Sequence, residues 1–95
     1  MRKWPVLIEP RAKRELEQFA RWYAARSKVV ADRFWFETAQ VLDLLSQFPF
    51  SAPASPAGRR RIHLRVFPIG FDYRVKDEAV EIIAVTHDKQ RPQTN

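Results

Sequence analysis

The candidate catalytic and anion-binding side chains cluster between positions 58 and 75, in the stretch GRRRIHLRVFPIGFDYRV. Polar and apolar side chains alternate at its start, which is typical of a strand and places Arg61, His63 and Arg65 on one face. A row of cations on a sheet can bind the phosphates of a nucleic acid or the carboxylates of a protein, because arginine makes bidentate contacts with such anions. The alternative is a solvated face that only keeps a small sheet soluble.

Histidine occurs twice, at His63 and His87. Two imidazoles can act as general acid and base, because histidine exchanges a proton near neutral pH. His63 falls on the cationic face, and His87 follows the last predicted strand. One predicted strand lies between the strand of His63 and the strand that His87 follows. These two strands are therefore expected to lie about 10 Å apart, within reach of one phosphate. The alternative is that His63 is a half-exposed strand residue and His87 a structural residue at a strand end.

A metal site is a weaker hypothesis for the same region. Metal ions such as zinc need three or four ligands with supporting hydrogen bonds. Beside the histidines, only Asp72 and Asp88 are candidates, and their spacing favours no ion. The chain has no cysteine, which excludes thiolate sites and disulfides. We therefore predict no metal and no cofactor.

Length and charge restrict the class of protein. The 95 residues are enough for a single domain, residues 1–95, with one hydrophobic core. The net charge of +6, from 17 Lys and Arg against 11 Asp and Glu, favours nucleic acid, ribosomes or an acidic protein as partner. The start lacks the apolar segment of a signal peptide, and no run reaches the roughly 18 apolar residues of a membrane span. We expect a cytoplasmic protein with no membrane partner.

Two helices are predicted before the basic stretch 58–75, and they must help to position its residues. Apolar residues recur at helical spacing from Arg11 to about Arg26, with Pro10 in the first turn. Ser27 is a suitable N-cap for a second helix that Pro49 ends. Its apolar stripe consists of Ala31, Phe34, Thr38, Val41, Leu45 and Phe48. The residues predicted to lie away from that stripe are Asp32, Arg33, Glu37, Gln40 and Asp43. With almost no linker, the helices should form an antiparallel hairpin.

Strands are predicted over residues 3–9, 61–67, 69–75 and 80–86, with a polar turn at 76–79. The last strand is nearly all apolar, which predicts a central strand covered on both faces. Residues 50–58, rich in Pro, Ala and Ser, predict a surface loop. The order β-α-α-β-β-β predicts an α+β fold in which a helical hairpin packs on a mainly antiparallel sheet.

Four segments carry a family resemblance: IEPRAKRELEQFARWYA, SKVVADRFWFETAQVLDLLSQFP, FPIGFDYRVKDEAVEIIAVTH and HDKQRP. Their order, with the size and the basic charge, resembles the ParE/RelE superfamily, the plasmid stabilisation family of toxins from bacterial type II toxin–antitoxin modules. The resemblance implies a RelE/ParE-like fold. It also implies a protein that arrests bacterial growth unless a cognate acidic antitoxin binds it, in a toxin–antitoxin hetero-oligomer.

The resemblance implies two different targets. ParE-like members poison DNA gyrase, whereas RelE-like members bind the ribosomal A site and cut mRNA. RelE-like nucleases divide the chemistry among basic residues on the second strand, an arginine on the third and groups after the fourth. Arg61 and His63 match the basic positions of the second strand in type, but the third-strand position carries Gly70. The stretch after the fourth strand, QRPQTN, lacks the tyrosine that many nucleases have in this stretch.

We therefore expect gyrase inhibition, with no chemistry in the toxin. The alternative is a ribosome-dependent mRNA interferase, an endoribonuclease with four candidate catalytic residues: Arg61, His63, His87 and Arg91. A third interpretation is a degenerate toxin that only binds its partner and represses their operon with it.

If the toxin acts by binding, basic and aromatic side chains are its contact residues. Those expected to contact the target or the antitoxin are Arg59, Arg61, Arg65, Arg74, Lys89, Trp22 and Trp35. The alternatives are a solvated face for the cations and packing on the helix stripes for the tryptophans. Apolar residues that a small monomer cannot fully bury, including Trp4, Phe36 and Phe50, favour a surface that binds a partner.

Overall fold

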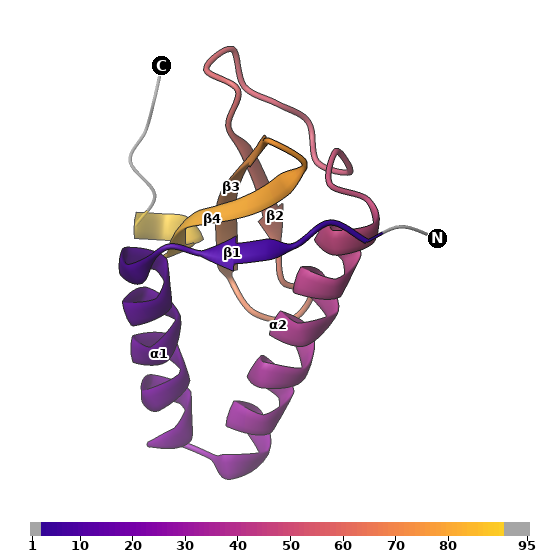
Figure 1. Cartoon of the computed structure of the whole chain (residues 1–95). Helices are drawn as coiled ribbons and strands as arrows, with labels where there is room; N and C mark the ends of the chain where they lie inside the picture. The colour runs from indigo at the N-terminus through magenta and orange to yellow at the C-terminus, as the bar shows by residue number, and fades with distance from the viewer. Residues whose placement is uncertain (1–2, 91–95) are drawn as a thin grey trace.

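The structure is a computed structural model, and it describes residues 3–90. One strand, two helices and three further strands follow one another along the chain, and the four strands form one sheet (Figure 1). The elements are β1 (Val6–Ile8), α1 (Pro10–Ala24), α2 (Lys28–Gln47), β2 (Arg60–His63), β3 (Ile69–Lys76), β4 (Ala79–His87) and a short 3-10 helix, η1 (Asp88–Gln90). This is the predicted order, so the α+β fold class is confirmed.

The sheet has the strand order β1-β4-β3-β2. β3 pairs antiparallel with both β2 and β4, and the predicted meander of the last three strands is confirmed. β1 runs parallel to β4 and is shorter than the predicted strand over residues 3–9. β1 and β2 are therefore the two edges of the sheet, and the apolar strand β4 lies inside it.

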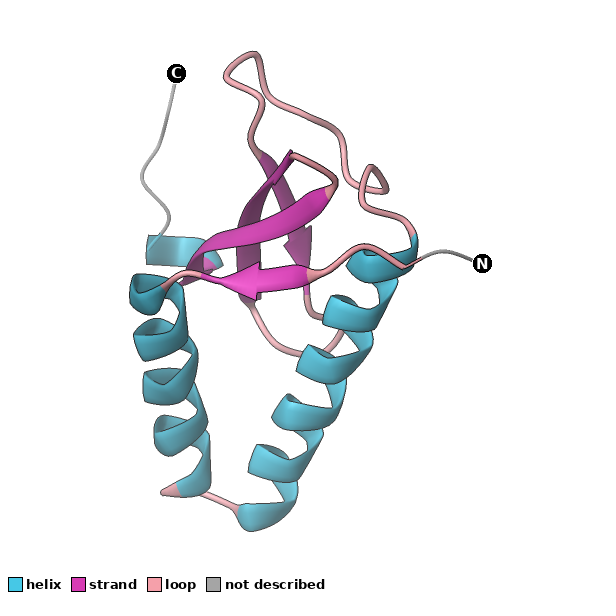
Figure 2. Cartoon of the chain, viewed as in Figure 1, coloured by secondary structure: helices cyan, strands magenta, loops and turns pink. Residues whose placement is uncertain are grey.

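The helices begin and end where local chemistry predicts. Pro10 occupies the first turn of α1, where its missing N–H costs no hydrogen bond. The Ser27 hydroxyl accepts a hydrogen bond from the Val30 N–H at 3.3 Å and caps α2. The two helices meet at residues 25–27, spread apart toward the sheet, and extend well beyond it at their joined end (Figure 2).

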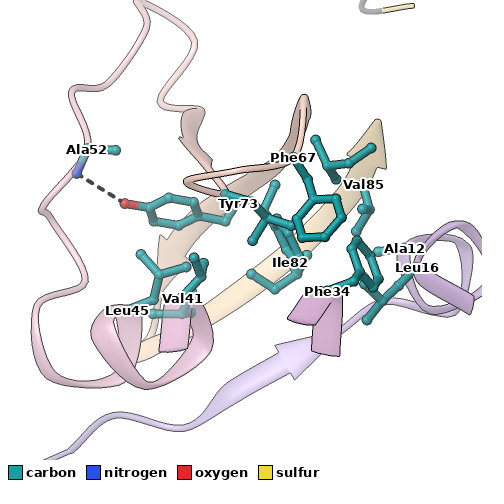
Figure 3. Packing of buried hydrophobic residues seen from close by; sticks show 14 of the residues in the cluster. Ala12, Leu16, Phe34, Val41, Leu45, Ala52, Phe67, Tyr73, Ile82 and Val85 are labelled. Carbon is teal, nitrogen blue, oxygen red and sulfur yellow. Dashed lines mark hydrogen bonds between the residues drawn. The ribbon is translucent and has the colours of Figure 1, made fainter. Parts of the chain in front are cut away.

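The core lies between the helical hairpin and the sheet (Figure 3). Phe34 of α2 and the strand residues Tyr73 and Ile82 are fully buried there. Burial of each such side chain stabilises the fold by about 1.5–3 kcal/mol. The Tyr73 hydroxyl accepts a hydrogen bond from the Ala52 N–H at 3.4 Å, which ties the loop before β2 to the core.

The second strand differs from its prediction over residues 61–67, because β2 ends at His63. Alternation fails beyond Leu64: Val66 is 65% exposed, whereas Phe67 is buried and its ring packs against Tyr23 at 4.8 Å. The N–H groups of Arg65 and Val66 donate to the Glu37 carboxylate of α2 at 2.8 and 3.1 Å instead of extending the sheet. Neither helix within residues 3–90 is both long and apolar enough to cross a bilayer.

Candidate functional site

Arg61 lies at the centre of a charged cluster on the sheet face that points away from the helices. Core residues such as Phe71 point toward the helices, so their neighbours along β3 point the other way. The Arg61 side chain is only 6% exposed, and its guanidinium forms ion pairs with Asp72 Oδ1 at 3.0 Å and Asp88 Oδ1 at 2.8 Å. It also donates to the hydroxyl and the carbonyl oxygen of Thr86, at 2.9 and 3.3 Å. We call Arg61, His63, Asp72, Thr86 and Asp88 the sheet-face cluster.

Gly70 gives the Arg61 guanidinium the room it occupies. A Cβ atom at Gly70 would overlap the guanidinium group, so a larger residue there would force the Arg61 side chain to shift. The RelE resemblance implies an arginine at the Gly70 position of the third strand. Here the side chain of Arg61, from β2, fills the space beside that position. The Arg61 Nε is buried and has no hydrogen-bond partner within the described residues.

His63 and His87 lie at the same end of the sheet, but the strand register places His63 on the outer face and His87 on the face that carries the core. His63 pairs in register with Gly70 of β3, and the preceding residue of β3, Ile69, pairs with His87. The His63 Nδ1 atom lies 3.1 Å from Asp88 Oδ1, and His63 is half exposed. The His87 Nδ1 atom accepts a hydrogen bond from the Lys89 N–H at 3.1 Å. Their roles as acid and base stay a prediction.

Asp88 joins the sheet to the turn that follows β4. Its N–H donates to the carbonyl oxygen of Pro68 at 2.9 Å, while its carboxylate contacts Arg61 and His63. Burial alone would raise the pKa of the Asp88 carboxyl. The Arg61 hydrogen bond and the charges of both neighbours outweigh that effect and hold its pKa below the ordinary value. Asp88 is therefore ionised at neutral pH and neutralises charge in the cluster.

The predicted row of three cations is interrupted. Arg61 is engaged by two carboxylates, and Arg65 lies in the loop after β2, with no ion pair among the described residues. Arg74 also contacts carboxylates, those of Glu81 at 2.5 Å and Glu9 at 3.6 Å. The predicted contact residues with exposed, unpaired cations within residues 3–90 are Arg59, Arg65 and Lys89. Arg91 lies outside the described residues.

A groove runs between α2 and the open edge of the sheet. Its volume is about 310 Å³, and it is lined by Glu37, Gln40, Val41, Leu44, Ile62, His63 and Arg65, which we call the edge groove. Leu44 is 40% exposed, and Phe36, two turns earlier on α2, is 56% exposed. The predicted unburied apolar surface is thus confirmed for Phe36 and for Phe50, which is 58% exposed and packs edge-on against Trp4 at 5.9 Å.

β2 presents free backbone groups next to the edge groove. The Leu64 N–H donates to the Ile69 carbonyl oxygen, which fixes the alternation of hydrogen bonds along the β2–β3 pair. In this phase the backbone N–H and C=O of His63 face away from β3. A loop residue, Ala54, bridges Arg60 at the start of the strand. The open part of the edge is therefore the C-terminal half of β2.

The prediction that Glu37 lies away from the buried stripe is wrong, because its side chain is only 1% exposed. Its carboxylate accepts hydrogen bonds from the two N–H groups after β2 and from Arg33 Nε at 2.8 Å. Burial raises the pKa of Glu37, but these donors outweigh burial and keep the pKa below its ordinary value. Helical spacing offered a signal only for the Arg33 pair, since the two backbone donors, Arg65 and Val66, lie 28 and 29 residues away.

The two tryptophans on the helices are each partly packed and partly exposed. Trp22 is 51% exposed and packs edge-on against Tyr23 at 5.1 Å. Trp35 is 44% exposed and packs against Phe34 at 5.8 Å. Both side chains therefore retain surface for a partner, and their role in binding stays a prediction. Within the described residues, no three His, Asp or Glu side chains gather as a set of metal ligands.

Comparison with known proteins adds independent findings. The family model for the ParE toxin of the type II toxin–antitoxin system parDE matches residues 6–92. The fold is similar to a chain of the chromosomal ParDE system from P. aeruginosa, with a TM-score of 0.76, 17% identity, and coverage of 90% of this chain and 96% of that one. It is also similar to a chain of the RelBE2 toxin–antitoxin complex from Mycobacterium tuberculosis, with a TM-score of 0.57, 23% identity and coverage of 92% and 93%. The chain has no significant match among curated protein sequences.

Proposed function

The chain belongs to the ParE toxin family of type II toxin–antitoxin systems, and we propose that it arrests bacterial growth by inhibiting DNA gyrase. The observation that supports this target most is the engagement of Arg61 by Asp72 and Asp88. A toxin that acts by binding needs no free catalytic cation. A toxin that cuts RNA does need one, because the dianionic phosphorane is stabilised by preorganised positive charge.

The charge balance of the sheet-face cluster argues against phosphate binding there. One arginine faces two carboxylates, so the cluster carries a net charge of −1 when His63 is neutral. An incoming phosphate would have to displace carboxylates from a guanidinium that is almost fully buried. Gly70 contributes no cation from β3. These features favour gyrase inhibition over mRNA cleavage.

We propose that the cognate acidic antitoxin docks in the edge groove and along β2. The groove has an apolar wall formed by Leu44 and Ile62, and the open half of β2 can pair with an extended segment of a partner. The unpaired arginines Arg59 and Arg65 lie just before and just after β2, where they favour carboxylates on that partner. Binding there produces a toxin–antitoxin hetero-oligomer.

One observation favours the second candidate, a ribosome-dependent mRNA interferase. A carboxylate that accepts a hydrogen bond from His63 Nδ1 orients the imidazole and leaves Nε2 to accept a proton, as in catalytic Asp–His pairs. His63 is exposed enough to reach a substrate. The 2′-hydroxyl of a bound RNA would be the group that loses its proton.

Pulse labelling after induced expression separates the two candidates. We expect DNA synthesis to fall within minutes while protein synthesis continues, and purified gyrase to lose supercoiling activity when the toxin is added. Early collapse of protein synthesis, with cleaved mRNA in ribosome fractions, would contradict gyrase inhibition and favour the interferase. A toxin mixed with its antitoxin before the assay is the control.

A further inference from the structure

The joined end of the helical hairpin carries a second exposed surface, far along the helices from the edge groove. It consists of Arg21, Trp22 and Arg26 near the end of α1, and Val29 and Val30 at the start of α2, which we call the hairpin-end surface. In Figure 1 this end of the hairpin projects away from the sheet. Along α2, Val30 precedes Glu37, the first groove residue, by seven residues, or about 10 Å, and Val29 precedes Leu44 by fifteen residues, or about 22 Å.

Trp22 is held in place although half of it is exposed. Its ring packs edge-on against Tyr23, whose own ring lies 5.3 Å from Phe34 and 4.8 Å from Phe67, both buried. The Arg26 guanidinium lies 3.3 Å from the centre of the Trp22 indole and donates to the Trp22 carbonyl oxygen at 2.9 Å. A partner that contacts this indole therefore loses little conformational entropy in ordering it.

The joined end of the hairpin combines exposed apolar residues with positive charge. Val29 is 78% and Val30 38% exposed, although both side chains are aliphatic. Arg21 and Arg26 have no carboxylate partner within the described residues. The nearby Asp32 is engaged by Lys28 at 3.0 Å. Tryptophan and arginine are also the residue types that most often dominate the binding energy of protein interfaces.

We propose that the hairpin-end surface binds the cellular target of the toxin, through an acidic protein surface that surrounds an apolar pocket for Trp22. This inference rests on the proposed function in one respect, that the toxin acts by binding a protein. It does not depend on that protein being gyrase. It divides the two binding tasks, with the antitoxin in the edge groove and the target at the opposite end of α2.

The test compares variants of the two surfaces in the full-length toxin. Trp22→Ala and Arg21→Glu alter the hairpin end, and Leu44→Glu alters the groove. Lys76→Glu, at the last residue of β3, repeats the charge change of Arg21→Glu at an exposed cation elsewhere. Three properties are measured for each: growth arrest on induction, affinity for the purified cognate antitoxin, and melting temperature. Arg21→Glu tests the surface even if Trp22→Ala destabilises the hairpin, because the Arg21 side chain is exposed and forms no ion pair or side-chain hydrogen bond within residues 3–90.

We expect both hairpin-end variants to need at least ten times more expression for the same growth arrest, with antitoxin affinity within twofold of the wild type. We expect Leu44→Glu to show the reverse, and Lys76→Glu to match the wild type. Hairpin-end variants that keep full toxicity, or that lose antitoxin affinity as Leu44→Glu does, would overturn the proposal.

Purified gyrase distinguishes the failure of this inference from the failure of the proposed function. If the wild type does not inhibit gyrase but the hairpin-end variants lose growth arrest, the target is another protein and the surface assignment stands. If the wild type and the hairpin-end variants inhibit gyrase equally, the surface assignment is wrong and the gyrase assignment stands. A wild type that arrests no growth would overturn both.

Discussion

The sheet-face cluster and the edge groove share strand β2, but their arginines are in opposite states. Arg61, on the outer face, is almost fully buried and bound by two carboxylates, whereas Arg65, just beyond the strand, is exposed and has no ion pair among the described residues. Both residues belong to the same alternating stretch of sequence. A cation is therefore available to a partner only where the fold supplies no internal anion, whatever the local charge of the sequence.

The largest expected difference between the two arginines is in stability, and Arg61→Ala tests it. It leaves Asp72 and Asp88 without their counter-charge, and we expect a loss of about 3 kcal/mol in the free energy of unfolding, measured by urea denaturation. Arg65→Ala, the control, is expected to stay within about 0.5 kcal/mol of the wild type. Equal effects of the two substitutions would show that the cluster does not stabilise the fold.

The groove side of the comparison is tested by Leu44→Glu. A carboxylate in the apolar wall of the groove should weaken antitoxin binding about 30-fold, equivalent to about 2 kcal/mol, as measured by calorimetry. Leu7→Glu is the matched control, because Leu7 is 53% exposed on β1, at the other edge of the sheet. The groove assignment fails if both variants bind the antitoxin equally well.

The Glu37 carboxylate accepts hydrogen bonds from the loop that carries Arg65, so the stability of that loop should depend on pH. Its folded-state pKa is lowered, so it stabilises the fold above the unfolded-state pKa of about 4.3, and this contribution disappears as the pH falls through the folded-state value. Glu37→Gln should cost about 1–2 kcal/mol at pH 7 and flatten the loss of stability between pH 5 and 3.

Urea denaturation across that pH range measures the effect. Glu17→Gln, which neutralises an exposed glutamate on α1, is the control and should leave the acid profile of the wild type unchanged. An unchanged profile for Glu37→Gln as well would show that Glu37 does not carry the acid sensitivity.

The smallest expected effect is that of the histidines. His63→Ala and His87→Ala should leave growth arrest within about twofold of the wild type, because gyrase inhibition requires no proton transfer. The measurement is viable counts over a series of inducer concentrations. If either variant abolishes growth arrest while its melting temperature is unchanged, mRNA cleavage becomes the favoured mechanism.

Local signals predicted much of this protein correctly. The helices follow from apolar spacing, Pro10 and the Ser27 cap, and the last hairpin follows from its alternating residues and polar turn. These features depend on interactions between residues a few positions apart, so they can be derived without knowledge of the tertiary structure. The family resemblance of four segments in this order was equally accessible, and the ParE family model confirms it.

The state of each charged residue depended instead on contacts between distant segments. Arg61 meets Asp72 and Asp88, 11 and 27 residues away, only because the register of three strands aligns them beside Gly70. Glu37 is buried because the chain after β2 turns its N–H groups toward α2 rather than continuing the alternation. Periodicity assigns a side chain to a face of one element, but its burial and its counter-charges are set by the element that packs against that face.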